Sequence, residues 1–290
     1  MHPRSEFLPA ASKARTFSRL QEDILRVFVY FDIFKYPLKA EEVYMFLPSN
    51  STSPAEIARA CTAQPLDRIV HQKGDHYFVA DSRGSSNFLS LRLENERRAR
   101  TYLLIARIFG RLIRTFPFVR AVFISGELSK GVSTRQGDID FFIITAANRL
   151  WIARVVLTAF KKTFLLNSKK FFCLNHFITE DYLDVTDRNL YSALEIATLK
   201  PLYNIRLYDA YRDRNSWIKD YFPNLRSSTG RDNGIPSRPI VQRLLEAPFK
   251  GNFGDRLDLK IMELWKKIWI RRYSTLPKEK REALFRCERF

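Results

Sequence analysis

The chain has 290 residues, of which 46% are hydrophobic and 14% aromatic, so it can form about two folded domains and is not a solvated low-complexity chain. Its formal net charge of +18 creates a positive field that attracts nucleic acids, nucleotides or anionic membrane surfaces. Its three cysteines, Cys61, Cys173 and Cys287, are far apart and odd in number, which favours neither a disulfide framework nor a zinc knuckle.

No segment of the sequence predicts export or membrane insertion. Residues 1–19 are polar and basic without an apolar stretch, and no later segment reaches about eighteen uninterrupted apolar residues. We therefore expect residues 1–19 to be a mobile leader of a cytoplasmic protein that has no membrane partner.

Residues 20–81 carry the pattern of a winged helix-turn-helix domain. Apolar spacing and turn residues predict three short helices and then a hairpin. The helices are expected at 20–34, 39–47 and 54–63, and the strands at 67–70 and 76–80. Ser53 and Pro54 form an N-cap and first-turn pair for the third helix. That helix carries only Arg59 and Glu56 as charged residues, which favours packing against a neighbour over DNA reading, although nucleic acid stays a candidate partner.

Residues 82–222 alternate between helical and strand patterns. A long helix is predicted over 87–115, with an apolar stripe on one side and arginines on much of the other. Those arginines are most simply a solvated face, with the alternative that they guide an anionic substrate toward a nearby glycine turn. Strands are predicted at 119–124, 139–145 and 170–178, and further helices at 150–166 and 189–199.

This alternation predicts a small mixed sheet with flanking helices, and the fold class of the chain is therefore α+β. Residues 223–240 contain Ser, Thr, Gly, Asn and Pro and are expected to form a linker. Residues 241–290 are expected to be a C-terminal helical segment, with its main helix at 257–272.

The stretch that points most directly to function is a glycine turn followed by two aspartates. A buried strand leads into Ser125-Gly126, and Gly126 permits backbone N–H groups to approach a phosphate closely. Asp138 and Asp140 are two residues apart, so in a strand both carboxylates point to one face, where they can share a hard cation. Ile139 and Phe141 then point into the core.

These residues resemble the nucleotidyltransferase superfamily related to DNA polymerase beta, in its minimal form, within a bacterial group that adds an N-terminal winged helix. The resemblance covers 122–145: residues 125–131 align with the Gly-Ser loop and its closing basic residue and glycine, and 138–140 with the Asp-x-Asp motif. It implies transfer of a nucleoside monophosphate from an NTP to an unidentified acceptor. It also implies Asp138 and Asp140 as catalytic ligands of Mg²⁺ or Mn²⁺, and a nucleotide-binding set of Ser125, Gly126, Ser129 and Lys130.

The chain departs from this family at two positions. Glu127 stands where the family generally has Ser, and its charge opposes phosphate binding unless the side chain turns away or binds a metal. Asn175 stands where the family supplies a third carboxylate, and an amide is no general base. Three residues could replace that carboxylate: Glu180, Asp181 and Glu195. His176 is a further candidate base, although a His on an apolar strand is more often a hydrogen-bonded core residue.

Two main functions therefore remain open from the sequence. The first is an Mg-dependent nucleotidyltransferase, which the combination of turn, strand and aspartates favours. The second is a non-catalytic nucleotide- or nucleic-acid-binding protein with a degenerate nucleotidyltransferase fold, which Glu127 and Asn175 favour. A toxin or antitoxin component regulated by a partner chain is a third option.

Overall fold

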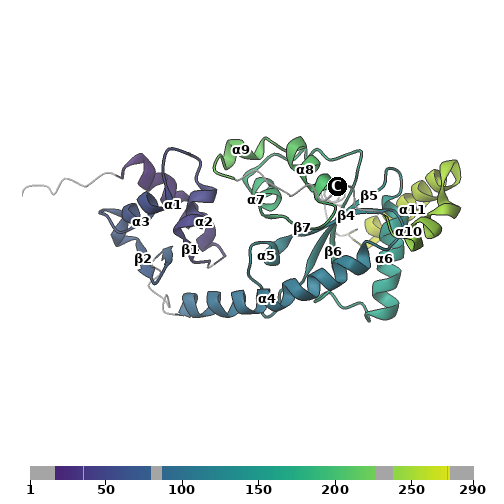
Figure 1. Ribbon diagram of the computed structural model, residues 1–290, viewed down its shortest axis with the longest axis horizontal. Helices are drawn as coiled ribbons and strands as arrows, with labels where there is room; N and C mark the ends of the chain where they lie inside the picture. The colour runs from purple at the N-terminus through teal and green to yellow at the C-terminus, as the bar shows by residue number, and fades with distance from the viewer. Residues whose placement is uncertain (1–16, 35, 80–86, 226–237, 273, 275–290) are drawn as a thin grey trace, which may run out of the picture. The chain divides into compact units, whose positions relative to one another are not determined.

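The computed structural model describes residues 17–34, 36–79, 87–225, 238–272 and 274 (Figure 1). Residues 1–16 of the expected leader and 226–237 of the expected linker lie outside the described residues. The chain divides into two compact units, and each contains both helices and strands, as expected for an α+β protein. The first unit comprises 1–90 with 222–224, and the second comprises 91–221 with 225–290. None of the described helices is long and apolar enough to cross a membrane.

The first unit contains three helices and a small antiparallel sheet in the order β1-β3-β2. The helices are α1 (Arg19–Asp32), α2 (Ala40–Phe46) and α3 (Pro54–Cys61), and the strands are β1 (Leu38–Lys39), β2 (Val70–Lys73) and β3 (His76–Val79). The predicted cap of α3 is confirmed, because the Ser53 hydroxyl accepts from Glu56 N–H in a capping box. The strand predicted at 67–70 is largely wrong: Leu66–Arg68 forms a 3₁₀ turn after Pro65, and the strand begins at Val70.

The second unit is built on a four-stranded mixed sheet in the order β6-β5-β4-β7. Its strands are β4 (Val119–Ile124), β5 (Asp140–Thr145), β6 (Cys173–Thr179) and β7 (Lys200–Tyr203). β4 is antiparallel to β5 and β7, and β5 is parallel to β6. The longer helices are α4 (Phe88–Ile113), α6 (Leu150–Phe164), α7 (Leu190–Thr198), α8 (Ile205–Arg214) and α11 (Gly251–Arg272), and the shorter elements are α5 (Gly126–Ser129), α9 (Ile218–Tyr221), α10 (Ile240–Glu246) and the 3₁₀ turn η3 (Ala247–Phe249).

The two faces of this sheet pack against different helices. One face carries Val122, Ile124, Phe141 and Ile143 into a core with α4 and α6. The opposite face carries Phe123 and Phe142, whose rings contact Tyr208 and Tyr211 of α8. Because side chains alternate along a strand, Asp140 at the start of β5 shares the face of Phe142. The carboxylate predicted to bind metal therefore lies on the side of the sheet that α8 covers.

Several elements of the second unit are not those predicted from the sequence. β7, α8 and α9 are additional, α10 lies in the expected C-terminal helical segment, and α11 begins at Gly251, six residues before the expected start of the main helix. A proline after a helical pattern ordinarily marks the end of the helix, and Pro201, which follows the helix expected at 189–199, lies within β7. β7 is the last strand of the sheet, and an edge strand tolerates a residue that lacks an N–H donor.

Candidate functional site

The glycine turn lies at the end of β4, where the chain enters the short helix α5. Gly126 has a φ of +65°, a backbone conformation that favours glycine. A Cβ atom at this position would lie 2.3 Å from Asp140 Oδ2. The turn is held from inside, because the buried Ser129 hydroxyl donates to the Gly126 carbonyl at 2.7 Å. The Asp140 carboxylate therefore packs directly against the Gly126 backbone.

Replacing Gly126 with alanine is expected to destabilise the protein more than the same change at Gly251. Both glycines have φ near +65°, but a Cβ at Gly251 would meet no atom within 4 Å. The backbone strain, about 1–2 kcal/mol, is common to both variants, while the clash with Asp140 adds about 1–3 kcal/mol in Gly126→Ala alone. Urea unfolding of the two variants measures this difference. Equal losses of stability would show that Asp140 does not occupy the space against Gly126.

The two aspartates occupy different backbone environments. β5 begins at Asp140, so Asp138 precedes the strand and the alternation expected to align the two side chains does not apply to it. Ile139 between them is fully buried, as predicted. Asp140 is held in place because its backbone carbonyl accepts from Ser125 N–H at 2.9 Å and the Cys173 thiol hydrogen-bonds its carboxylate. Asp138 is half-buried and has no hydrogen-bond or ion-pair partner among the described residues.

Negative charge is concentrated around Asp140. Burial raises the pKa of the Asp140 carboxyl, and the neighbouring carboxylates of Asp138, Glu195 and Glu127 raise it further, in that order. In a chain of net charge +18, three acidic side chains thus act on the Asp140 carboxyl beside a single turn. A bound cation would relieve this repulsion, so the local charge fits a metal ion better than a bare anion.

Glu127, the residue that departs from the family motif, is bonded to the loop that precedes Asp138. Its Oε2 accepts from Thr134 N–H at 2.9 Å, and the same oxygen would lie 2.8 Å from a Cβ at Gly137. The carboxylate is therefore directed toward the 134–137 loop and holds that loop against the glycine turn. Its charge still acts on Asp140, as the smallest of the three carboxylate contributions to the raised pKa.

Of the three residues that could replace the family's third carboxylate, the structure brings Glu195 to the site. Glu195 lies on α7, and its Oε1 accepts from Lys130 Nζ at 2.7 Å. Lys130 also donates to the Gly126 carbonyl at 3.2 Å. By contrast, Glu180 is 3.8 Å from the guanidinium of Arg120, and Asp181 is exposed to solvent. Lys130 thus links Glu195 to the glycine turn.

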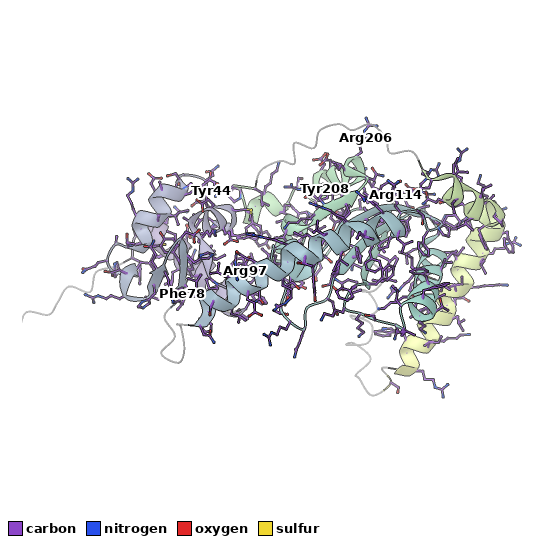
Figure 2. All side chains as sticks on the ribbon, turned by 60° about the horizontal axis from the view of Figure 1, so that its bottom comes forward. Tyr44, Phe78, Arg97, Arg114, Arg206 and Tyr208 are labelled. Carbon is purple, nitrogen blue, oxygen red and sulfur yellow. The ribbon has the colours of Figure 1, made fainter. Side chains whose placement is uncertain are left out.

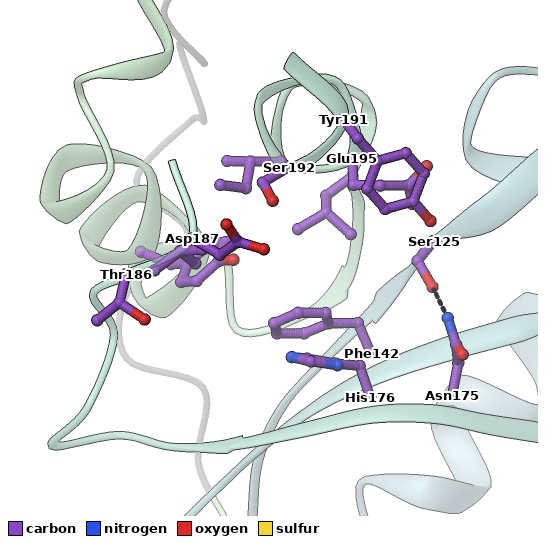
Figure 3. Close-up of a pocket in the computed structure, with 13 residues that line it drawn as sticks. Ser125, Phe142, Asn175, His176, Thr186, Asp187, Tyr191, Ser192 and Glu195 are labelled. Atoms are coloured by element: carbon purple, nitrogen blue, oxygen red, sulfur yellow. Dashed lines mark hydrogen bonds between the residues drawn. The ribbon is translucent and has the colours of Figure 1, made fainter. Parts of the chain in front are cut away.

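A cavity of about 310 Å³ opens on the same side of the sheet, next to Ser125 and Glu195 (Figure 3). Phe142 and His176 lie on one side of it with their ring centroids 4.9 Å apart, and Asp187, Ser192 and Tyr191 lie across from them. The remaining lining residues are Asn175, Val185, Thr186, Ile196, Leu199 and Tyr211. The cavity is therefore largely apolar and aromatic, with hydroxyl, amide and carboxyl groups at its margin.

Asn175 and His176 both face this cavity. Asn175 donates from Nδ2 to the Ser125 hydroxyl at 3.3 Å, so it positions the residue before the glycine turn (Figure 3). Burial lowers the pKa of His176 to about 4, and the positive charge of Arg154 contributes. A neutral imidazole with so low a pKa is a weak base at neutral pH. His176 therefore contributes to this cavity as an aromatic wall residue and not as a base.

The site at the glycine turn offers some, but not all, of the ligands that a divalent metal ion needs. Among the described residues, no group of three or more His, Cys, Asp or Glu side chains is arranged to hold a metal ion. Mg²⁺ commonly binds through one or two carboxylates and completes its shell with water and substrate phosphates. Asp138 and Asp140 supply two such oxygen donors. These residues therefore suit a metal ion that binds together with a nucleotide, and they do not form a site in which protein ligands alone surround the ion.

No family model, no curated protein and no solved structure matches this chain.

Proposed function

We propose that this protein is a nucleotidyltransferase that moves a nucleoside monophosphate from an NTP to an acceptor hydroxyl. The observation that carries the proposal is the packing of the Asp140 carboxylate against Gly126, with Asp138 and Glu195 acting on the same group. In the same proposal, the second unit has the nucleotidyltransferase fold and the first unit is a winged helix-turn-helix. The resemblance of 122–145 to the DNA polymerase beta superfamily supports this reading.

In the proposed reaction the acceptor oxygen attacks the α-phosphorus of the NTP. An O–P bond forms, the bond from the α-phosphorus to its bridging oxygen breaks, and pyrophosphate leaves with that electron pair. Glu195, which lines the cavity beside the turn, takes the hydroxyl proton. Asp138 and Asp140 would hold Mg²⁺ or Mn²⁺, which when bound neutralises the triphosphate and the charge that develops on pyrophosphate. Lys130 keeps Glu195 oriented through their 2.7 Å ion pair.

The proposal predicts metal-dependent transfer of the α-phosphate label. Purified protein is incubated with each NTP labelled at the α- or the γ-phosphate, with Mg²⁺ or Mn²⁺ and with hydroxyl-bearing acceptors. We expect covalent transfer of the α label only, release of the γ label as pyrophosphate, and loss of both on addition of EDTA. Transfer of the γ label would indicate a phosphotransferase. Absence of transfer with every NTP and acceptor class would count against the enzyme.

A specific observation favours the alternative of binding without turnover. Lys130, the expected phosphate neighbour, already donates to Glu195, and Glu127 adds negative charge near the turn. Such a site can still bind a nucleotide that arrives with a cation, while Lys130 is already engaged by Glu195 and is less able to stabilise the charge that develops on pyrophosphate. Calorimetry that detects nucleotide or nucleic-acid binding together with a negative transfer assay would establish this alternative.

A further inference from the structure

One face of α4 carries a row of exposed arginines that the proposed transfer reaction does not use. The row consists of Arg97, Arg100, Arg107, Arg111 and, one residue past the helix end, Arg114. At 100° per residue these positions fall within an arc of about 100° on the helix surface. At 1.5 Å per residue the row extends for about 26 Å. Figure 2 labels its two ends, Arg97 and Arg114.

The charge of this row is not compensated within the described structure. α4 contains two acidic residues, Glu94 and Glu96, and these pair with Arg98 and Arg92 at 2.7 Å, outside the row. None of the five row arginines forms an ion pair with a described carboxylate. Arg114 makes a cation–π contact with the Tyr203 ring. Like charges three and four positions apart repel one another in a helix. An anionic partner would offset that repulsion.

The row is suited to a phosphate backbone rather than to a membrane. The basic residues of α4 are all arginine, and a guanidinium binds phosphate in a two-pronged manner that an ammonium cannot. The apolar side of α4, which includes Ala99, Tyr102 and Ala106, is buried in the core. Three exposed apolar residues, Leu93, Leu104 and Ile108, lie among or beside the five arginines, so charge dominates this face and the apolar area is small for insertion among lipids. Because phosphates are closely spaced along nucleic acid, a row of this length can lie within reach of several of them.

We propose that the arginine row of α4 is a nucleic-acid-binding surface that contacts the phosphate backbone without reading bases. This surface differs from the third helix of the first unit, which carries one Arg and one Glu. It is also separate from the glycine turn and its carboxylates, so the proposal does not depend on the transfer reaction. Binding through such a row would be insensitive to sequence and strongly dependent on salt.

The test compares two triple variants of equal charge in the full chain. Arg100→Gln, Arg107→Gln and Arg111→Gln remove the centre of the row, whereas Lys162→Gln, Arg243→Gln and Arg256→Gln remove three exposed basic residues from α6, α10 and α11. Each set lowers the net charge from +18 to +15 (18 − 3). Gln is a good helix former, so both proteins are expected to fold, which circular dichroism checks.

Fluorescence anisotropy with a labelled 20-base-pair DNA duplex and with its single strand measures affinity between about 50 and 200 mM salt. We expect the row variant to lose at least about tenfold in affinity at 100 mM salt, and its slope of log K against log salt to fall by about 2 to 3. The other variant is expected to change less than about twofold. Equal losses in both variants, or no binding by the wild type, would overturn the proposal. Row-dependent capture by vesicles containing phosphatidylserine, without binding to either nucleic acid, would also overturn it.

Discussion

Replacing Asp140 with asparagine is expected to lower the rate of nucleotide transfer by at least about a thousandfold and to leave the fold as stable as the wild type or more stable. The rate loss corresponds to about 4 kcal/mol of transition-state stabilisation, within the range that a metal ion supplies. The stability follows from the environment of the side chain. Burial and three neighbouring carboxylates raise the pKa of Asp140, which means that its charged form is disfavoured in the folded protein.

The combination of lost activity and retained stability distinguishes a functional carboxylate from a structural one. Transfer of α-labelled NTP and urea unfolding are measured on Asp140→Asn, on Asp138→Asn and on Asp213→Asn, an exposed aspartate of α8. The Asp213 variant is expected to match the wild type in both assays. A second readout is the gain of thermal stability when Mg²⁺ and NTP are added, which the Asp140 variant should lack. Full activity of Asp140→Asn would remove the basis of the proposed reaction.

Replacing Glu246 with alanine is expected to cost about 3–5 kcal/mol in the free energy of unfolding. Glu246 is 4% exposed, and its Oε1 accepts from Phe118 N–H and from Arg120 Nη1, each at 2.7 Å. Its Oε2 is also 3.4 Å from Arg238 Nη1. Truncation leaves the Arg120 guanidinium half-buried without this partner, and it leaves a backbone N–H without its acceptor.

Urea unfolding measures the effect, with Glu263→Ala as the control. Glu263 is exposed on α11 and has no ion pair among the described residues, so its loss is expected to change stability by less than about 0.5 kcal/mol. Glu246→Gln is expected to fall between the two, because it keeps an acceptor for Phe118 N–H but loses the charge. Similar midpoints for Glu246→Ala and Glu263→Ala would show that α10 does not hold the start of β4.

Local signals in the sequence predict much of the fold. The strand at 119–124 agrees with β4 residue for residue, because an apolar run interrupted only by Arg120, between a proline and a glycine turn, leaves little choice. The cap at Ser53 is equally local. β7 could not be found in the same way, because its stability comes from pairing with β4, and Pro201 in isolation indicates the end of a helix. The buried side of α10 likewise depends on contacts with residues more than one hundred positions away.

In the candidate site, too, local sequence predicts some features and tertiary packing determines the others. The motif predicts Gly126 and Asp140 as neighbours, and the structure places them in contact. The sequence cannot choose among Glu180, Asp181 and Glu195, since the choice depends on how α7 packs on the sheet. The ion pair between Lys130 and Glu195 joins residues that are 65 positions apart, and no spacing rule reveals it. The aromatic side of the cavity combines residues from β5, β6 and α8 and is equally a product of tertiary packing.

The proline in β7 also affects how the edge of this sheet can pair with a strand from another chain. A terminal strand normally offers a line of free donors and acceptors that invites an incoming strand, which is a common origin of aggregation and of strand-swapped dimers. With four residues, one of them unable to donate, β7 is a poor template for such growth. Within the described part of the chain, the longer β6 at the opposite border is the place where an added strand would find a more continuous set of backbone partners.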